Sequence, residues 1–199
     1  MERYNLALMT KKIYDSGLKL FTLNVLKDLL EIKKESTLLR IINKLVVNGV
    51  LEKIERGKYL LKGGRINDFV LANFIYCPSY ISFESALNFY GILSQFPYEI
   101  TSATSKKTTK KMAEGKIFSY VHIQKSLFWG YEKSNDFLIA LPEKALVDQL
   151  YLASKGLRKV DLDEYDFSLI NWGRFKDYLQ KCPQTRQFRS IIKWLPKIK

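Results

Sequence analysis

The sequence predicts a mixed α+β protein with two domains, and three observations support this. Helix-like and strand-like hydrophobic patterns alternate along the 199 residues, and hydrophobic side chains make up 47% of the chain, enough for a sizeable core. Gly63 and Gly64 mark a joint after the first third of the chain. Because the pattern changes at this joint, we expect domains at residues 1–64 and 65–199.

The first domain is predicted to hold three helices followed by a hairpin. Apolar residues recur at helical spacing in residues 3–16, in a second helix capped by Thr22 or Asn24, and in a third capped by Ser36 or Thr37. The third helix ends at residues 48–49. Its apolar stripe consists of Leu38, Ile41, Ile42 and Leu45. The strand-like runs VLEKI and KYLL follow, joined by a tight turn at residues 55–57.

This order is typical of a winged helix-turn-helix DNA-binding domain. There the N-terminal part of the third helix enters the major groove, and the hairpin reaches the DNA backbone. Arg40 is suited to guanine and Asn43 to adenine, while lysines contact phosphates. The predicted DNA-binding residues are Lys33, Lys34, Ser36, Thr37, Arg40, Asn43, Lys44, Arg56 and Lys58. The alternative is that these residues form only a solvated surface.

The charge of the chain supports a polyanionic partner. The 33 basic and 20 acidic residues give a net charge of +13. Residues 1–66 carry 14 basic and 7 acidic side chains, net +7, against net +6 for the remaining 133 residues. The first domain is therefore about twice as basic per residue. The alternative is a protein that is basic without a polyanionic partner.

The second domain is predicted to be α+β, with a small sheet between helices. A helix is expected at residues 82–91, with Ser82 as its cap, and another at 142–154, with Pro142 in the favoured first position. Further helices are expected at residues 66–76, 171–181 and 184–195, and strands at 98–104, 116–123, 126–132 and 136–141. The aromatic residues Phe83, Phe89, Tyr90 and Phe96 are expected in the core.

The run TSKKTTKK at residues 104–111 is expected to connect two strands of this domain. It holds Lys106, Lys107, Lys110 and Lys111 without an acidic residue between them. A lone basic run is weak evidence for a ligand. It is either a solvated loop or an additional surface for DNA, RNA or a protein partner.

The sequence gives little support for enzyme chemistry. His122 is the one histidine, and no P-loop, GxGxxG or HExxH motif is present. Glu143 and Asp148 on one helix leave a nuclease site as a minor alternative, whereas Asp161 and Asp163 fit an exposed loop. We predict a protein that is not an enzyme and has no catalytic residues, metal or cofactor.

The expected location is the cytoplasm. The two cysteines, Cys77 and Cys182, are far apart and lack the spacing of a disulfide framework or zinc site. The chain starts without the long apolar run of a signal peptide, and no 18-residue apolar segment predicts a membrane span.

Two stretches of the second domain resemble the AbiEi family of abortive-infection antitoxins. One is S-x-E-S-A-L-x-x-Y-G-I at residues 82–92, and the other is P-E-K-A-L-V-D at residues 142–148. The resemblance extends through YEITSATSKKTTKK and KIFSYVHI and covers nearly the whole chain. The third helix departs from the family expectation, since it has one arginine among lysines.

The resemblance implies a role in a type IV toxin–antitoxin system for phage defence. The first domain would bind inverted repeats in its own promoter and repress the operon. The second would oppose a nucleotidyltransferase-like toxin without a stable complex, and no membrane partner is implied. The alternative is a winged-helix transcriptional regulator whose second domain senses a small ligand.

Overall fold

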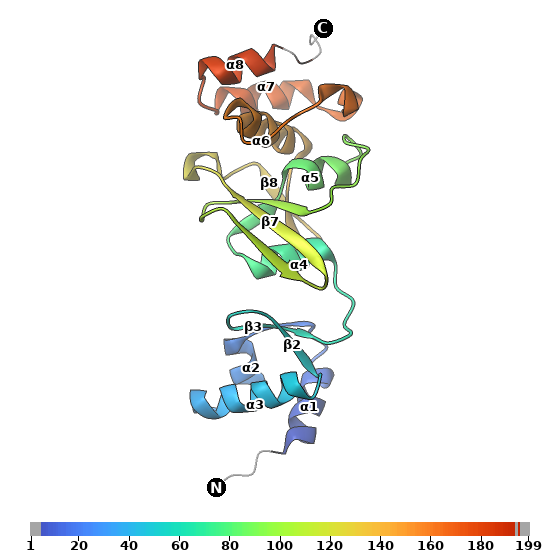
Figure 1. Ribbon diagram of the computed structural model, residues 1–199, viewed down its shortest axis with the longest axis vertical. Helices are drawn as coiled ribbons and strands as arrows, with labels where there is room; N and C mark the ends of the chain where they lie inside the picture. Colours follow the sequence, from blue (N-terminus) through green and yellow to red (C-terminus); the bar gives the residue numbers. More distant parts are fainter. Residues whose placement is uncertain (1–4, 194, 196–199) are drawn as a thin grey trace. The chain divides into compact units, whose positions relative to one another are not determined.

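The computed structural model describes residues 5–193 and 195, and the chain has a mixed α+β fold (Figure 1). It divides into two compact units, Met1–Asn67 and Asp68–Lys199. No helix in the described part of the chain is long and apolar enough to span a bilayer. The starting residues 3 and 4 of the predicted first helix, and Trp194 of the last, lie outside the described residues.

Short polar side chains cap the first two helices of the first unit, and a lysine occupies the cap position of the third. Helix α1, Leu6–Asp15, is capped by Asn5, whose side chain accepts a hydrogen bond from the Ala7 N–H at 3.0 Å. Helix α2, Leu23–Leu29, is capped by Thr22, one of the two predicted caps. Helix α3, Glu35–Val47, contradicts the predicted caps, because its N-cap is Lys34.

Three strands form a small antiparallel sheet beside these helices. They are β1, Leu20–Thr22; β2, Leu51–Glu55; and β3, Lys58–Leu61. The order is β1-β3-β2, so the predicted hairpin occupies two positions and β1 completes the sheet. Strand β1 was not predicted, because a three-residue strand is too short to show an alternating pattern.

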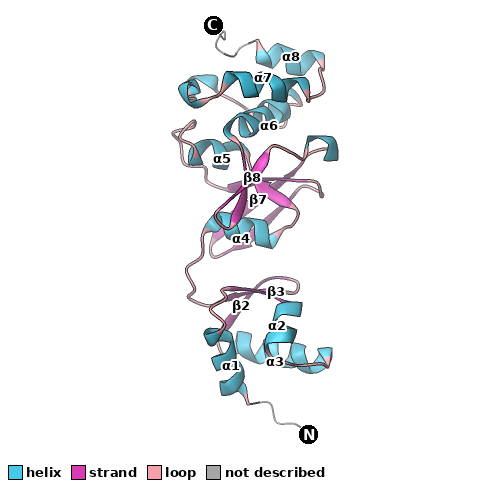
Figure 2. Ribbon diagram, turned by 180° about the vertical axis from the view of Figure 1, so that it is seen from behind, coloured by secondary structure: helices cyan, strands magenta, loops and turns pink. Residues whose placement is uncertain are grey.

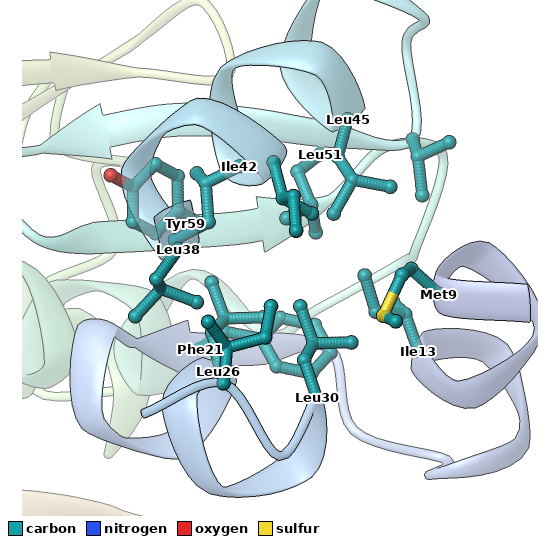
Figure 3. Packing of buried hydrophobic residues seen from close by; sticks show 13 residues of the cluster. Met9, Ile13, Phe21, Leu26, Leu30, Leu38, Ile42, Leu45, Leu51 and Tyr59 are labelled. Atoms are coloured by element: carbon teal, nitrogen blue, oxygen red, sulfur yellow. The ribbon is translucent and has the colours of Figure 1, made fainter. Parts of the chain in front are cut away.

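The core of the first unit lies between its helices and this sheet (Figure 3). Every residue of the apolar stripe on α3 is buried, as predicted. Phe21 from β1 and Leu26 and Leu30 from the α2 segment pack in the same cluster. Met9 and Ile13 join it from α1, so all the main elements of this unit share one core.

The second unit contains one six-stranded mixed sheet, with order β6-β7-β5-β4-β9-β8. Strands β7 and β8 of this sheet are labelled in Figure 2. Pairs β4–β9 and β5–β7 are parallel, and the other neighbours are antiparallel. The strands are β4, Ser79–Ile81; β5, Ile100–Thr104; β6, Thr109–Ala113; β7, Lys116–His122; β8, Tyr131–Ser134; and β9, Phe137–Ala140. Strands β4 and β6 were not predicted.

Helices cover both faces of this sheet. Helix α4, Asp68–Ile75, lies on one side, and α5, Phe83–Phe89, and α6, Pro142–Ser154, lie on the other (Figures 1 and 2). Helices α7, Trp172–Gln180, and α8, Arg186–Ile192, pack outside α6. Short 3-10 turns at Lys125–Leu127, Leu162–Glu164 and Phe167–Leu169 complete the unit. Helix α6 is therefore buried between two layers.

The predicted aromatic core of the second unit is correct only in part. Phe83 is fully buried, but Phe89 is 47% exposed and Phe96 is 90% exposed. Phe96 lies in the connection between α5 and β5. Hydrophobicity alone therefore did not decide burial, since Phe89 is exposed at the last residue of α5 and Phe96 is exposed in a connection.

Candidate nucleic-acid interface

The outward face of α3 gathers the central residues of the predicted DNA-binding set. With the apolar stripe turned to the core, a period of 3.6 residues places Ser36, Arg40 and Asn43 on the opposite side of the helix. These three side chains are exposed, as is Lys44 beside them, while Thr37 is half-buried. The structure thus brings guanidinium, amide and hydroxyl groups together on one helical surface.

The polar groups of this face are available to a ligand. Among the described residues, no hydrogen bond or ion pair involves the side chains of Arg40, Asn43 or Lys44. The bond that Lys44 does make is through its carbonyl oxygen, which accepts from the Asn48 side-chain amide at 2.8 Å. Their donors and acceptors can therefore contact an incoming partner without breaking an interaction of the folded chain.

The N-terminus of α3 is open because its cap lacks a side-chain acceptor. Lys34 occupies the N-cap, and in the described part of the chain no side chain makes a cap hydrogen bond to this helix. Ser36 and Thr37 therefore lie in the first turn and do not cap the helix. The exposed Lys33 and Lys34 and the positive end of the helix dipole favour an anion at this position, whereas the exposed Glu35 carboxylate in the first turn opposes one.

The hairpin tip presents one exposed cation. Arg56 is exposed at the turn between β2 and β3, and Gly57 has a positive φ of 70° that this tight turn requires. The Leu23 N–H donates to the Gly57 carbonyl at 2.9 Å, which fixes the tip against the start of α2. Lys58 is half-buried and interacts within the chain.

Two exposed apolar residues of α3 were not among the predicted DNA-binding residues. Leu39 is 40% exposed and Val47 is 85% exposed, both on α3 outside the apolar stripe. Apolar side chains can contact the thymine methyl group in the major groove. The sequence signal for these exposed residues was that α3 holds more apolar residues than its buried stripe.

The two stretches that carry the family resemblance meet in the core of the second unit. The Asp148 carboxylate accepts hydrogen bonds from the Tyr80 hydroxyl at 2.9 Å and the Ser82 hydroxyl at 2.8 Å. It also forms an ion pair with Lys144, and the two side chains are only 3% and 1% exposed. The Lys144 ammonium donates to the Tyr80 hydroxyl at 3.1 Å. We call these four residues the buried polar cluster.

The surroundings of the buried polar cluster hold it away from water. The Lys144 ammonium lies 4.8 Å from the centre of the Trp129 ring. Burial, and then the neighbouring Asp148 carboxylate, raise the pKa of Tyr80 well above its ordinary value. Burial also raises the pKa of Cys182 to about 11. Tyr80 and Cys182 therefore stay protonated at neutral pH.

Two further carboxylates of these stretches link helices. Glu143 accepts from the Asn171 N–H at 2.9 Å and pairs with Arg174 at 3.4 Å, so it binds the start of α7. Glu84 accepts from the Gln149 side chain at 3.0 Å, which joins α5 to α6. Ser82 occupies the predicted N-cap of α5, but its hydroxyl binds Asp148 and makes no cap bond.

These contacts give Glu143 and Asp148, the candidate nuclease residues, structural roles. Both oxygens of each carboxylate contact side-chain or backbone donors of the chain itself. The described residues contain no group of three or more His, Cys, Asp or Glu that could hold a metal ion. Asp161 caps the 3-10 turn Leu162–Glu164 by accepting from the Asp163 N–H.

The predicted lysine loop divides into a connection and an edge strand. Residues 105–108, with Lys106 and Lys107, cross from β5 to β6, whereas Lys110 and Lys111 lie within β6. Strand β6 forms because Glu114 and Gly115, with φ of 50° and 69°, make the two-residue hairpin turn to β7. The predicted single loop is therefore corrected to two structurally different segments.

The comparisons with known proteins do not assign a family. Neither a protein-family model nor a curated protein sequence matches the chain. Among solved structures, the chain is similar to the RV2827C protein from Mycobacterium tuberculosis, with 16% identity and a TM-score of 0.49. That match covers 97% of this chain and 83% of the other. At this identity and TM-score, we base no conclusion on the similarity.

Proposed function

We propose that the chain is a DNA-binding antitoxin of a type IV toxin–antitoxin system, with the first unit as a winged helix-turn-helix domain that represses its own operon. The observation that carries the DNA half is the outward face of α3, where Arg40, Asn43 and Lys44 are exposed and unpaired within the described residues. A helix of this kind reads base edges in the major groove.

The element order of the first unit supports this proposal. Helices α2 and α3 are consecutive and share one core, and the β2–β3 hairpin follows α3 directly. In the proposed complex, α3 lies in the groove and Arg56 at the hairpin tip contacts the backbone. The exposed Lys33 and Lys34, which precede α3, then contact a phosphate.

The antitoxin half of the proposal rests on the resemblance to the AbiEi family. The residues of both resembling stretches hold α5, α6 and β4 together through the buried polar cluster and Glu84. We infer that these stretches maintain the unit, and that exposed surfaces around them oppose the toxin. The partner is a nucleotidyltransferase-like protein, opposed without a stable complex.

Fluorescence anisotropy with a promoter fragment tests the DNA half. The full chain binds the fragment more tightly than random duplex DNA, and log K falls steeply with log salt, by about 0.9 for each phosphate contacted. Arg40→Ala weakens promoter binding by about 1–3 kcal/mol and affects random duplex much less, because a base contact supplies specificity.

Arg65→Ala is the matched control for this measurement. Arg65 is also exposed in the first unit, but it lies after β3, away from α3 in sequence. The control removes the same charge and leaves promoter preference intact. Equal affinity for promoter and random duplex would contradict the repressor role, and an unchanged Arg40→Ala affinity would remove Arg40 from the reading surface.

A further inference from the structure

A shallow hollow on the second unit has features of a nucleic-acid site separate from α3. It has a volume of about 590 Å³ and is lined by Tyr76, Ser105, Lys106, Lys107, Thr108 and His122. Three segments supply these residues: the residue that follows α4, the connection 105–108 and the last residue of β7. Two aromatic rings thus border the same hollow as two lysines.

The sheet topology explains why these residues meet. Strand β7 lies between β5 and β6, so the connection 105–108 must cross the end of β7. Strands lie about 4.8 Å apart, so four residues span two strand spacings, about 10 Å. The connection passes beside His122, which pairs in register with Thr104 at the end of β5.

Hydrogen bonds fix the connection against its surroundings. The Tyr76 hydroxyl donates to the Lys107 carbonyl at 3.1 Å, and the His122 N–H donates to the Thr108 hydroxyl at 3.0 Å. The Lys106 ammonium donates to the Cys77 carbonyl. This pattern differs from a solvated loop, since the backbone that presents the lysines is held at both ends and in the middle.

The chemistry of the hollow suits a phosphate beside a base. His122 Nδ1 lies 2.9 Å from the Lys106 carbonyl oxygen. Because a carbonyl only accepts, Nδ1 carries the hydrogen and Nε2 is left as the second ring nitrogen for a ligand. The bond of Lys107 is made by its carbonyl, so its exposed ammonium remains available within the described residues.

We propose that this hollow binds single-stranded nucleic acid, with Lys107 on a phosphate and the His122 ring against a base, while Tyr76 and Lys106 hold the connection in place. Single-strand sites combine basic grooves with aromatic side chains on which unstacked bases rest. A duplex keeps its bases stacked inside and offers no free base face to the His122 ring. The site is independent of the duplex surface proposed for α3.

The test is fluorescence anisotropy of the full chain with a labelled oligoadenylate of about ten nucleotides, as RNA and as DNA. Excess unlabelled random duplex is present, so that any duplex-binding surface is already occupied. We expect Lys107→Glu to weaken single-strand binding about ten-fold and to reduce its dependence on salt. Truncation of the ring by His122→Ala weakens it roughly five-fold or more. The tighter of RNA and DNA identifies the natural strand.

Lys133→Glu is the matched control, because Lys133 is an exposed lysine on β8 of the same unit and the charge change is identical. We expect it to change binding by less than about two-fold. Equal losses of single-strand affinity from Lys107→Glu and Lys133→Glu would show that binding depends only on the net charge of the unit, and would overturn the proposal. Displacement of the oligonucleotide by the duplex, or no binding by the unaltered chain, would also overturn it. Promoter binding measured on the same variants shows separately whether α3 functions.

Discussion

The buried polar cluster gives the sharpest prediction about stability. Asp148→Asn removes the charge opposite Lys144, whose side chain is 1% exposed, and turns an amide toward the ammonium group. Removing one partner of a buried ion pair lowers the free energy of unfolding by about 3–5 kcal/mol, because the other charge stays buried without compensation. With a urea dependence of about 2 kcal/mol/M, the unfolding midpoint falls by roughly 2 M.

Tryptophan fluorescence during urea unfolding is the assay. The tryptophans are residues 129, 172 and 194, all in the second unit, so the signal reports this unit alone. Trp129 also lies against the Lys144 ammonium. The matched control is Asp177→Asn on α7, where the aspartate is exposed and the expected change is below about 0.5 kcal/mol.

A double variant separates charge from hydrogen bonding. Lys144→Met with Asp148→Asn leaves no charge in the buried polar cluster, and it should be more stable than Asp148→Asn alone by at least about 1 kcal/mol. If Asp148→Asn has the stability of the unaltered chain, or if the double variant is less stable than the single one, the ion pair does not support this core.

Two further predictions concern the same region. Gly130→Ala should destabilise the second unit by about 1–3 kcal/mol, because Gly130 has a φ of 74° and an added Cβ would lie 3.0 Å from the Lys144 Cγ. Gly156→Ala, with a similar φ of 69° but open space, should cost less in the same urea titration. Since burial raises the Cys182 pKa from 9.0 to about 11, the folded thiol keeps its proton longer than the unfolded one, and stability from this group is full below pH 9 and lost as pH rises through 11. Urea titrations between pH 8 and 11 should show a shallower fall for Cys182→Ala, and an unchanged pH dependence would contradict the assignment.

Local hydrophobic patterns in the sequence predicted the third helix and the hairpin of the first unit correctly. The apolar stripe on α3 and the β2–β3 hairpin are confirmed, because both depend on near neighbours in the chain. The cap of α3 was wrong. Ser36 and Thr37 are good cap residues, yet the chain enters the helix at Lys34. Cap preferences locate a helix start only to within one or two residues.

The candidate sites were less predictable because they depend on contacts between distant residues. Helix α6 was predicted from Pro142, but nothing in its pattern shows that Lys144 and Asp148 are buried. Their environment comes from Tyr80 and Ser82, more than 60 residues earlier. The hollow beside His122 likewise requires the strand order, because β6 and β5 lie on opposite sides of β7.

Growth rescue tests the central claim most directly. The chain is expressed together with the nucleotidyltransferase-like toxin that the proposal expects to be encoded beside it, and colony formation is counted. We expect the unaltered chain to restore growth, and Arg40→Ala to restore it equally while losing repression of a promoter reporter. Failure of the unaltered chain to restore growth would contradict the antitoxin role, and loss of rescue by Arg40→Ala would contradict the division of functions between the two units.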